Sequence, residues 1–401
     1  MKFKLLTLLG IRPDYIRMYK LIKLLDGYKD NFEHILVHSG QHYDPELFGN
    51  FLKEFDIRQP DIDLGIGLTL KERGVSNHAY QVALLSERVF DLIEKIKPDA
   101  VMYLGDTNTV LSSITVARCG VPVIHLEAGG RSFDWRMPEE KNRVVIDHLS
   151  DALYSYLPRY KDILVSEGID DFRIKVIGNI IMDAVNNHEA KADTSKILEE
   201  LGVKEKQFIL VTLHREENIS AKEILKNKLS DILRFAKEEK LPVVFPVMPR
   251  TAAIVEQYEL EYLLNDSQFI KTKPLGFFDF LKAEKTARLI VSDSGTVQEE
   301  ALIMGTPCVI ARRSTERPET IWAGATILEG LEGKETLYNK MREAYNMKTD
   351  WDKKVLNPEG GSPSERAYQD FISKVQSNYF ETSRSFKALK NKEVVRKAYG
   401  Q

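Results

Sequence analysis

Residues 100–127, AVMYLGDTNTVLSSITVARCGVPVIHLE, contain a complete strand, helix and strand pattern. The apolar runs at 100–104 and 121–127 suit buried strands, and the segment between them has helical periodicity. Strands that alternate with helices in this way are typical of βαβ units and a parallel sheet. The same alternation occurs upstream, with strand patterns at 3–10 and 34–40 and helical patterns at 15–28 and 45–56. The chain therefore begins with an α/β domain.

A second series of strand patterns follows a charged helical stretch. The chain has 401 residues, which is more than one hydrophobic core usually organises, so two domains are expected. We place the boundary near 178–200, where apolar strand runs are absent, and expect two doubly wound, Rossmann-like domains that face each other across a cleft. The expected domains are 1–185, 186–360 and C-terminal helices at 361–401 that pack back on the first domain. The strand patterns of the second series lie at 207–214, 241–247, 268–275, 287–295, 307–313 and 325–330.

The composition is that of an ordinary globular enzyme. Hydrophobic residues make up 43% and charged residues 29%, and the net charge of −3 argues against a nucleic-acid-binding surface. Cys119 and Cys308 are the two cysteines and stand beside small or apolar residues, so neither a disulfide framework nor a zinc site is expected. No apolar run approaches the ~20 residues of a membrane span. We expect a cytoplasmic protein. The Lys-rich stretch 383–401 is interpreted as a solvated helix, with contact to a membrane or an acidic partner as the alternative.

Four acids stand close together between residues 104 and 143. Asp106 and Glu127 end two apolar strand patterns, and ligands of open α/β sheets gather outside the carboxyl ends of such strands. Glu139 and Glu140 follow in a nearby loop. Carboxylates crowded into one crevice repel each other, which favours an active site. The alternative is that these acids cap helices or pair with arginines, namely Arg131, Arg136 and Arg143.

The stretch 291–301, VSDSGTVQEEA, predicts an anion site in the second domain. A strand pattern passes into a helix at Ser294, Gly295 and Thr296, where backbone N–H groups can bind a phosphate at the positive end of the helix dipole. Glu300, one turn further, could accept hydrogen bonds from a ribose diol. The alternative is a Ser- or Asp-capped helix with a capping-box Glu.

Three further strand ends carry polar residues. His214 and Arg215 end one strand pattern, where a catalytic and a structural histidine are equally compatible with the sequence. The loop 312–319 contains Arg312, Arg313 and Arg317, which suit a diphosphate or, alternatively, a charged surface. In the first domain Arg12 opens a helix and can reach a phosphate.

Eight motifs, from GIRPDYIRM at 10–18 to STERPE at 314–319, occur in a fixed order along the chain. Together they resemble the non-hydrolysing UDP-N-acetylglucosamine 2-epimerase family. The closer likeness, through SGQHYDPEL, RSFDWRMPEEKNRVVIDH and KPLGF, is to the capsule and O-antigen branch that includes UDP-N-acetyl-L-fucosamine-forming 2-epimerases. The resemblance implies two domains of the glycosyltransferase-B type, with UDP held mainly by the C-terminal domain. It also implies a homodimer. The motifs, which span most of residues 10–320, are GIRPDYIRM, SGQHYD, LGDTNT, HLEAGGRS, RMPEEKNR, THREEN, SDSGTVQEEA and STERPE.

The chemistry of this family explains the number of acids. The C2 proton of an N-acetylhexosamine is not flanked by a carbonyl, so the resemblance implies elimination of UDP to a 2-acetamidoglycal and its re-addition. Each face of C2 then needs a proton-transfer group, and the diphosphate needs cations. This scheme requires no nicotinamide and no metal. The other hypotheses are a hydrolysing relative that releases free sugar and UDP, a glycosyltransferase on the same fold, and a catalytically inactive sensor.

The resemblance also assigns roles to individual residues. The chain departs from the family pattern at several positions, including Arg17, where the family usually has Lys, and Thr296, where it has a second Gly. These departures leave two candidate substrates, UDP-GlcNAc and a 6-deoxy or otherwise modified UDP-HexNAc. Gln41, His42 and Arg215 correspond to positions by which some relatives bind a second UDP-GlcNAc as an allosteric activator. The catalytic set is Asp106, Glu127, Glu139 and His214, and the substrate-binding set is Arg12, Arg17, Arg143, Phe280, Ser294, Gly295, Thr296, Glu300 and Arg317.

Overall fold

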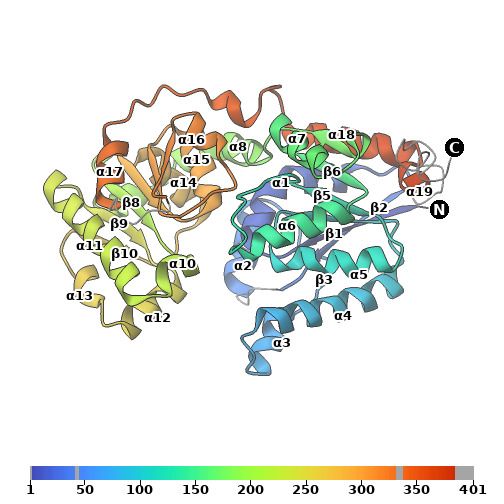
Figure 1. The fold of residues 1–401 in the computed structure, drawn as a ribbon, viewed down its shortest axis with the longest axis horizontal. Helices are drawn as coiled ribbons and strands as arrows, with labels where there is room; N and C mark the ends of the chain where they lie inside the picture. Colours follow the sequence, from blue (N-terminus) through green and yellow to red (C-terminus); the bar gives the residue numbers. More distant parts are fainter. Residues whose placement is uncertain (1, 41–44, 331–336, 384–401) are drawn as a thin grey trace. The chain divides into compact units, whose positions relative to one another are not determined.

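The computed structural model describes residues 2–40, 45–330 and 337–383, and these form two compact units (Figure 1). The first unit consists of the chain up to Ala184 together with the chain from Asn357, and the second is Val185–Leu356. The division between them falls within helix α8, Ile181–Asp193. Gln41, His42 and nearly all of the Lys-rich stretch lie outside the described residues.

The first unit is built on a seven-stranded sheet in the order β3-β2-β1-β4-β5-β6-β7. Every strand pair in it is parallel. The order reverses between β1 and β4, which places the carboxyl ends of these strands at a topological switch point, where ligands of such sheets bind. Its strands are β1 (Phe3–Leu9), β2 (Phe32–His38), β3 (Ile62–Asp63), β4 (Ala100–Leu104), β5 (Val123–Leu126), β6 (Ala152–Ser155) and β7 (Ile174–Val176).

Helices of the first unit bury apolar side chains against this sheet. Leu85, Val89 and Leu92 recur at helical spacing on α4 and pack in one cluster with Leu6 and Leu8 of β1. The helices are α1 (Arg12–Gly27), α2 (Pro45–Glu54), α3 (Ile66–Glu72), α4 (His78–Ile96), α5 (Ser113–Arg118), α6 (Pro138–Leu149), α7 (Pro158–Ser166), α18 (Pro363–Gln376) and α19 (Tyr379–Ser383), with short 3-10 turns at Asn108–Ser112 and Asp171–Arg173.

Helix α18 returns from the end of the chain to the first unit. It packs beside α1, and the ring of Phe371 meets those of Phe3 and Phe32 edge to face, with centroids 6.2 and 5.9 Å away. Lys20 of α1 also forms an ion pair with Glu365 at 2.8 Å. Figure 1 shows this helix, in red, beside the blue strands of the N-terminal sheet.

The second unit repeats the same plan with six parallel strands. Their order is β10-β9-β8-β11-β12-β13, so this sheet reverses between β8 and β11. The strands are β8 (Ile209–Thr212), β9 (Val243–Pro246), β10 (Phe269–Thr272), β11 (Leu289–Ser292), β12 (Cys308–Ile310) and β13 (Thr326–Leu328).

Both faces of the second sheet are buried. Ile209 and Val211 of β8 belong to the cluster that packs against α11, whereas Leu210, between them, packs with Val297 of α15. Successive side chains of a strand point to opposite faces of the sheet. A continuous apolar run therefore contributes side chains to the hydrophobic cluster on each face. The helices are α9 (Ile197–Leu201), α10 (Glu216–Ile219), α11 (Lys222–Glu239), α12 (Pro249–Gln257), α13 (Glu261–Leu264), α14 (Phe277–Thr286), α15 (Gly295–Met304), α16 (Glu319–Trp322) and α17 (Leu337–Tyr345), followed by a 3-10 turn at Lys353–Leu356.

The expected α/β class and the two doubly wound, parallel sheets are confirmed. All strand patterns taken from the sequence form strands, but β3, β6 and β7 were not predicted. Strands β3 and β7 consist of two and three residues and each contains a charged residue, Asp63 or Lys175, so neither forms an apolar run that can be recognised. Within the described residues, every helix is too short or too polar to cross a membrane.

Candidate active site

Asp106 stands in the turn that follows β4. Gly105 has a left-handed φ of +69°, a conformation that favours glycine, and it turns the chain so that Asp106 leaves the strand end. The Arg143 guanidinium, from α6, donates a hydrogen bond to the Asp106 carboxylate, and Asn142 Nδ2 donates to the Asp106 carbonyl at 2.9 Å. Helix α6 therefore holds both the side chain and the backbone of this acid.

Glu127 follows β5, next to the Asp106 turn. Its φ is +70°, which is strained for a residue with a side chain, and strain of this kind concentrates at functional sites. The buried guanidinium of Arg17 donates to the Glu127 carboxylate and, at 3.1 Å, to Asp14. A methyl group on Gly105 would lie 3.2 Å from Arg17 Nη2 and 3.5 Å from Glu127 Oε2. The turns that carry the two acids are thus in contact.

The other two acids have different environments. Glu140 is buried and accepts hydrogen bonds from the backbone of Ser132 and Phe133 and from Arg143 Nη1, at 2.7 to 3.0 Å. It therefore fixes the loop before α6, and it pairs with Arg143, as Asp106 does and as the arginine-partner interpretation predicts. Glu139 is half-buried in the first turn of α6.

His214 lies at the end of β8 in the second unit, beside the buried Asp293 at the end of β11. His214 Nδ1 is 3.0 Å from Asp293 Oδ1, and the backbone N–H groups of His214 and Arg215 both donate to Asp293 Oδ2, at 2.9 Å. Burial by itself raises the pKa of Asp293, but the hydrogen bond and charge of His214 outweigh it, so the net pKa is lowered. Because Asp293 is ionised and accepts a hydrogen bond, Nδ1 of His214 carries a proton. Nε2 of His214 is then available to contact another group.

Sequence reasoning missed the role of Asp293. The available signal was its place directly after an apolar strand pattern, as for His214. Strand β8 pairs with β11, with Thr212 opposite Ser292, so the two residues that follow these strands meet. Only the strand order reveals this.

The turn into α15 packs against the loop that carries Arg317. A methyl group on Gly295 would lie 2.8 Å from Glu316 Oε1 and 2.9 Å from Arg317 Nη1, so this close approach requires glycine. Arg317 is buried and pairs with Glu299 at 2.8 Å and Glu316 at 2.5 Å. The Ser294 side chain makes no capping hydrogen bond, so the capped-helix interpretation is wrong.

Comparison with known proteins places this geometry in a family. Residues 27–364 match the UDP-N-acetylglucosamine 2-epimerase family. The chain is 36% identical over 371 residues to UDP-N-acetylglucosamine 2-epimerase of Methanocaldococcus jannaschii, covering 90% of this chain and 96% of the relative. The chain belongs to the UDP-N-acetylglucosamine 2-epimerase family. As a member of this family it is an isomerase.

Two further similarities describe the range of the family. A crystal structure of the M. jannaschii UDP-GlcNAc 2-epimerase in complex with UDP-GlcNAc and UDP has a TM-score of 0.83 at 34% identity, covering 92% of this chain and 99% of that one. UDP-2,3-diacetamido-2,3-dideoxy-D-glucuronate 2-epimerase of Pseudomonas aeruginosa is 33% identical over 334 residues, covering 82% of this chain and 88% of the relative.

In the present chain, Glu300 lies on α15 and Phe280 lies on the neighbouring helix α14. Glu300 is buried, and beside it stands Glu284, which is fully buried. Burial raises the pKa of Glu284 well above its usual value, and the Glu300 charge raises it further. Phe280 is half-buried and packs against the apolar cluster that includes Phe208 and Val297.

The remaining predicted residues lie at several different places within their units. Arg12 begins α1, and its guanidinium lies 5.5 Å from the centroid of the Phe51 ring. Arg215 is the N-terminal cap of α10, and Thr296 is half-buried in α15. The surface-charge interpretation of the arginine loop is wrong for Arg312, which is buried, and correct for Arg313.

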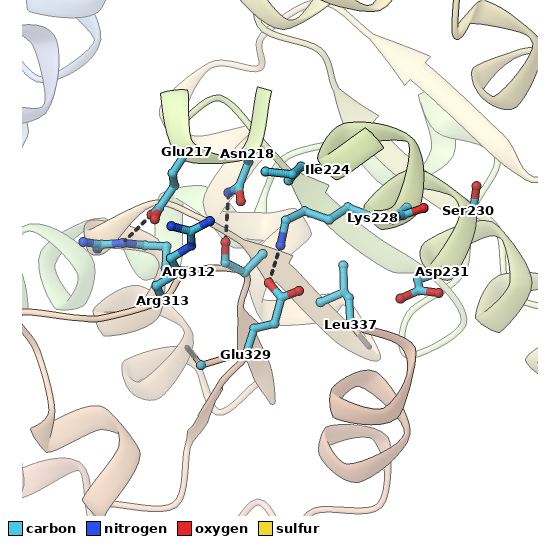
Figure 2. A pocket seen from close by; sticks show the side chains of 13 residues that line it. Glu217, Asn218, Ile224, Lys228, Ser230, Asp231, Arg312, Arg313, Glu329 and Leu337 are labelled. Carbon is cyan, nitrogen blue, oxygen red and sulfur yellow. Dashed lines mark hydrogen bonds and ion pairs between the residues drawn. The ribbon is translucent and has the colours of Figure 1, made fainter. Parts of the chain in front are cut away.

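A cavity of about 530 Å³ lies elsewhere in the second unit, between α11 and the ends of β12 and β13 (Figure 2). Figure 2 shows Lys228 pointing to Glu329, and the Arg312 guanidinium lies 3.6 Å from Glu217. Opposite charges that line this cavity therefore neutralise one another. Asn218 reaches its wall and donates to Asp293 at 2.8 Å, which connects the cavity to the support of His214.

Proposed function

We propose that this isomerase is a non-hydrolysing UDP-N-acetylglucosamine 2-epimerase that interconverts UDP-GlcNAc and UDP-ManNAc. The C2–H bond breaks as UDP leaves C1, which gives a 2-acetamidoglycal. A phosphate oxygen of UDP then adds back to C1, and a proton reaches the opposite face of C2. The observation that carries this proposal is the contact between the two strand-end turns of Asp106 and Glu127, each acid held by its own arginine.

In this reaction the acids of the first unit transfer protons and their arginines position them. Asp106, Glu127 and Glu139 are the proton-transfer groups, because two faces of C2 must each be served. Arg143 orients Asp106, and Arg17 orients Glu127. Arg12 binds phosphate.

The second unit binds UDP in this proposal. The backbone N–H groups of Gly295 and Thr296 at the start of α15 hold the diphosphate, with Arg317 beside them. The predicted N–H group of Ser294 donates instead to Ser292 Oγ at 3.0 Å. Glu300 binds the ribose and Phe280 the uracil. His214, whose Nδ1 is held by Asp293, presents Nε2 to the diphosphate or the sugar.

A modified UDP-HexNAc is the second candidate substrate. The similarity to an epimerase of a diacetamido uronate shows that relatives at this distance act on sugars altered outside C2. The capsule and O-antigen motifs favour a 6-deoxy sugar, as in formation of UDP-N-acetyl-L-fucosamine. We also propose that the enzyme serves polysaccharide biosynthesis and works as a homodimer.

The decisive experiment is incubation with UDP-GlcNAc in deuterated water, followed by NMR. Deuterium at C2 of intact UDP-sugar supports the proposal, whereas free sugar with UDP would identify a hydrolysing enzyme. Exchange with a 6-deoxy UDP-HexNAc alone would favour the second candidate. Glu127→Gln should slow exchange by about 100-fold or more, and Glu94→Gln, an exposed acid on α4, serves as the matched control.

A further inference from the structure

A row of charged residues lies buried beneath the turns of Asp106 and Glu127. His125 and Asp147 are completely inaccessible to solvent, and Arg131 is nearly so. His125 Nδ1 is 2.7 Å from Asp147 Oδ1, and His125 Nε2 is 2.9 Å from the carbonyl oxygen of Gly105. The ring therefore touches one partner on α6 and another in the turn that carries Asp106.

Both partners of the ring accept hydrogen bonds. The Gly105 carbonyl has no proton to donate, so Nε2 must carry one. Asp147 is held as a carboxylate by two other contacts, because Arg131 Nη1 lies 2.7 Å from its Oδ2 and the Gly129 N–H donates to the same oxygen at 3.2 Å. Burial raises the pKa of Asp147, yet its pKa is lowered overall, and Arg131 contributes to this through its charge and its hydrogen bond. An ionised Asp147 requires a proton on Nδ1 as well.

We infer that His125 is a buried imidazolium and a positioning residue for the reaction, which joins the turn of Asp106 to the turn of Glu127 through Asp147. This inference rests on the proposed function for its kinetic consequence. The imidazolium fixes the Gly105 carbonyl on one side. Asp147, its partner, fixes Gly129, two residues after Glu127, on the other.

The formal charges of His125 and the charged side chains next to it sum to zero. His125 and Arg131 contribute two positive charges, and Asp147 and Glu167 contribute two negative ones. Arg131 binds Glu167 through two hydrogen bonds of 2.9 and 2.7 Å, and Glu167 also lies 4.0 Å from the half-exposed His148. The acids above this row have separate cations, since Asp106 pairs with Arg143 and Glu127 with Arg17. With Asp147 ionised, a neutral His125 ring would unbalance the set and lose one of its two hydrogen bonds.

The charge of His125 can be measured on the whole enzyme by ¹⁵N NMR of ¹⁵N-histidine-labelled protein. We expect one histidine with both ring nitrogens protonated at neutral pH, because both partners of the His125 ring accept hydrogen bonds. The His125→Gln variant should lose this signal, and His148→Gln, which removes the exposed histidine next to Asp147 on α6, should keep it. A ring with one bare nitrogen at neutral pH would overturn the inference even if the variant does not fold.

Kinetics test the positioning role separately. His125→Gln should lower kcat by about 100-fold, the scale of a small misplacement of reacting groups, while KM and the affinity for UDP stay near wild type. Asp147→Asn, which keeps the shape and removes the counter-charge, should remove the doubly protonated signal and lower kcat likewise. His148→Gln should retain wild-type kcat. Unchanged kcat in folded His125→Gln would refute the role. Lack of C2 exchange in the wild type would refute the proposed function alone, since the NMR charge measurement needs no substrate.

Discussion

Replacing Glu284 by methionine should stabilise the second unit, and the gain should grow with pH. Glu284 is fully buried on α14, and within the described part of the chain its carboxyl group has no hydrogen-bond partner apart from that of Glu300. Burial raises its pKa well above the usual 4.5, so the folded protein keeps it protonated at pH values where the unfolded chain has released the proton. Methionine fills a similar volume and carries no proton to lose.

The magnitude follows from proton linkage. Because the folded state binds the extra proton, wild-type stability falls as pH rises above the unfolded pKa, by up to about 1.4 kcal/mol for each pH unit. From that value to neutral pH the loss reaches up to about 3 kcal/mol while the folded group stays protonated. Near pH 4 the group is protonated in both states, so the proton-linked difference between variant and wild type vanishes there. The free energy of unfolding of Glu284→Met should therefore exceed that of the wild type by an amount that increases with pH.

Urea unfolding at a series of pH values measures this difference. Trp322 and Trp351 both lie in the second unit, so a Trp135→Phe background reports that unit alone. Glu256→Met, which replaces an exposed glutamate on α12, is the control and should track the wild type. If the stability curves of Glu284→Met and wild type run parallel across this pH range, the reasoning about Glu284 is refuted.

Three other predictions concern the candidate site. Amide replacements of the three acids (Asp106, Glu127, Glu139) should each lower turnover by about 100-fold or more with UDP affinity retained, and near-normal turnover in all three would contradict their roles. Gly295→Ala should weaken UDP binding in calorimetry, because its methyl group displaces Glu316 and Arg317; unchanged affinity would place the nucleotide elsewhere. Asp293→Asn should lower the thermal midpoint at pH 7. Since the folded pKa of Asp293 is lowered from its usual 3.8, its stabilisation exists above that value and disappears as pH falls below it, so equal losses at pH 7 and pH 3 would contradict the assignment.

Much of the fold was predictable because most of its strands lie in apolar runs between turn residues. Strands buried on both faces need no alternation with polar positions, so runs such as 100–104 and 289–292 stand out in the sequence. The acids and His214 were likewise visible as polar residues directly after such runs. Strands β3 and β7 were not visible in the sequence, since they have two and three residues and each contains a charged residue.

By itself, then, the sequence determined the α/β class, the two strand series and the strand ends where polar chemistry gathers. Only the tertiary structure decided which partners meet there. Arg17 reaches Glu127 across 110 residues of chain because β1 and β5 flank β4, and His214 meets Asp293 because β8 adjoins β11. The contacts of the buried His125 with Asp147 and the Gly105 carbonyl were likewise decided by the tertiary structure. Local hydrophobic periodicity indicates which side chains are buried. Hydrogen bonds and ion pairs depend instead on strand order, because strand order brings residues that are distant in sequence within 3 Å of each other.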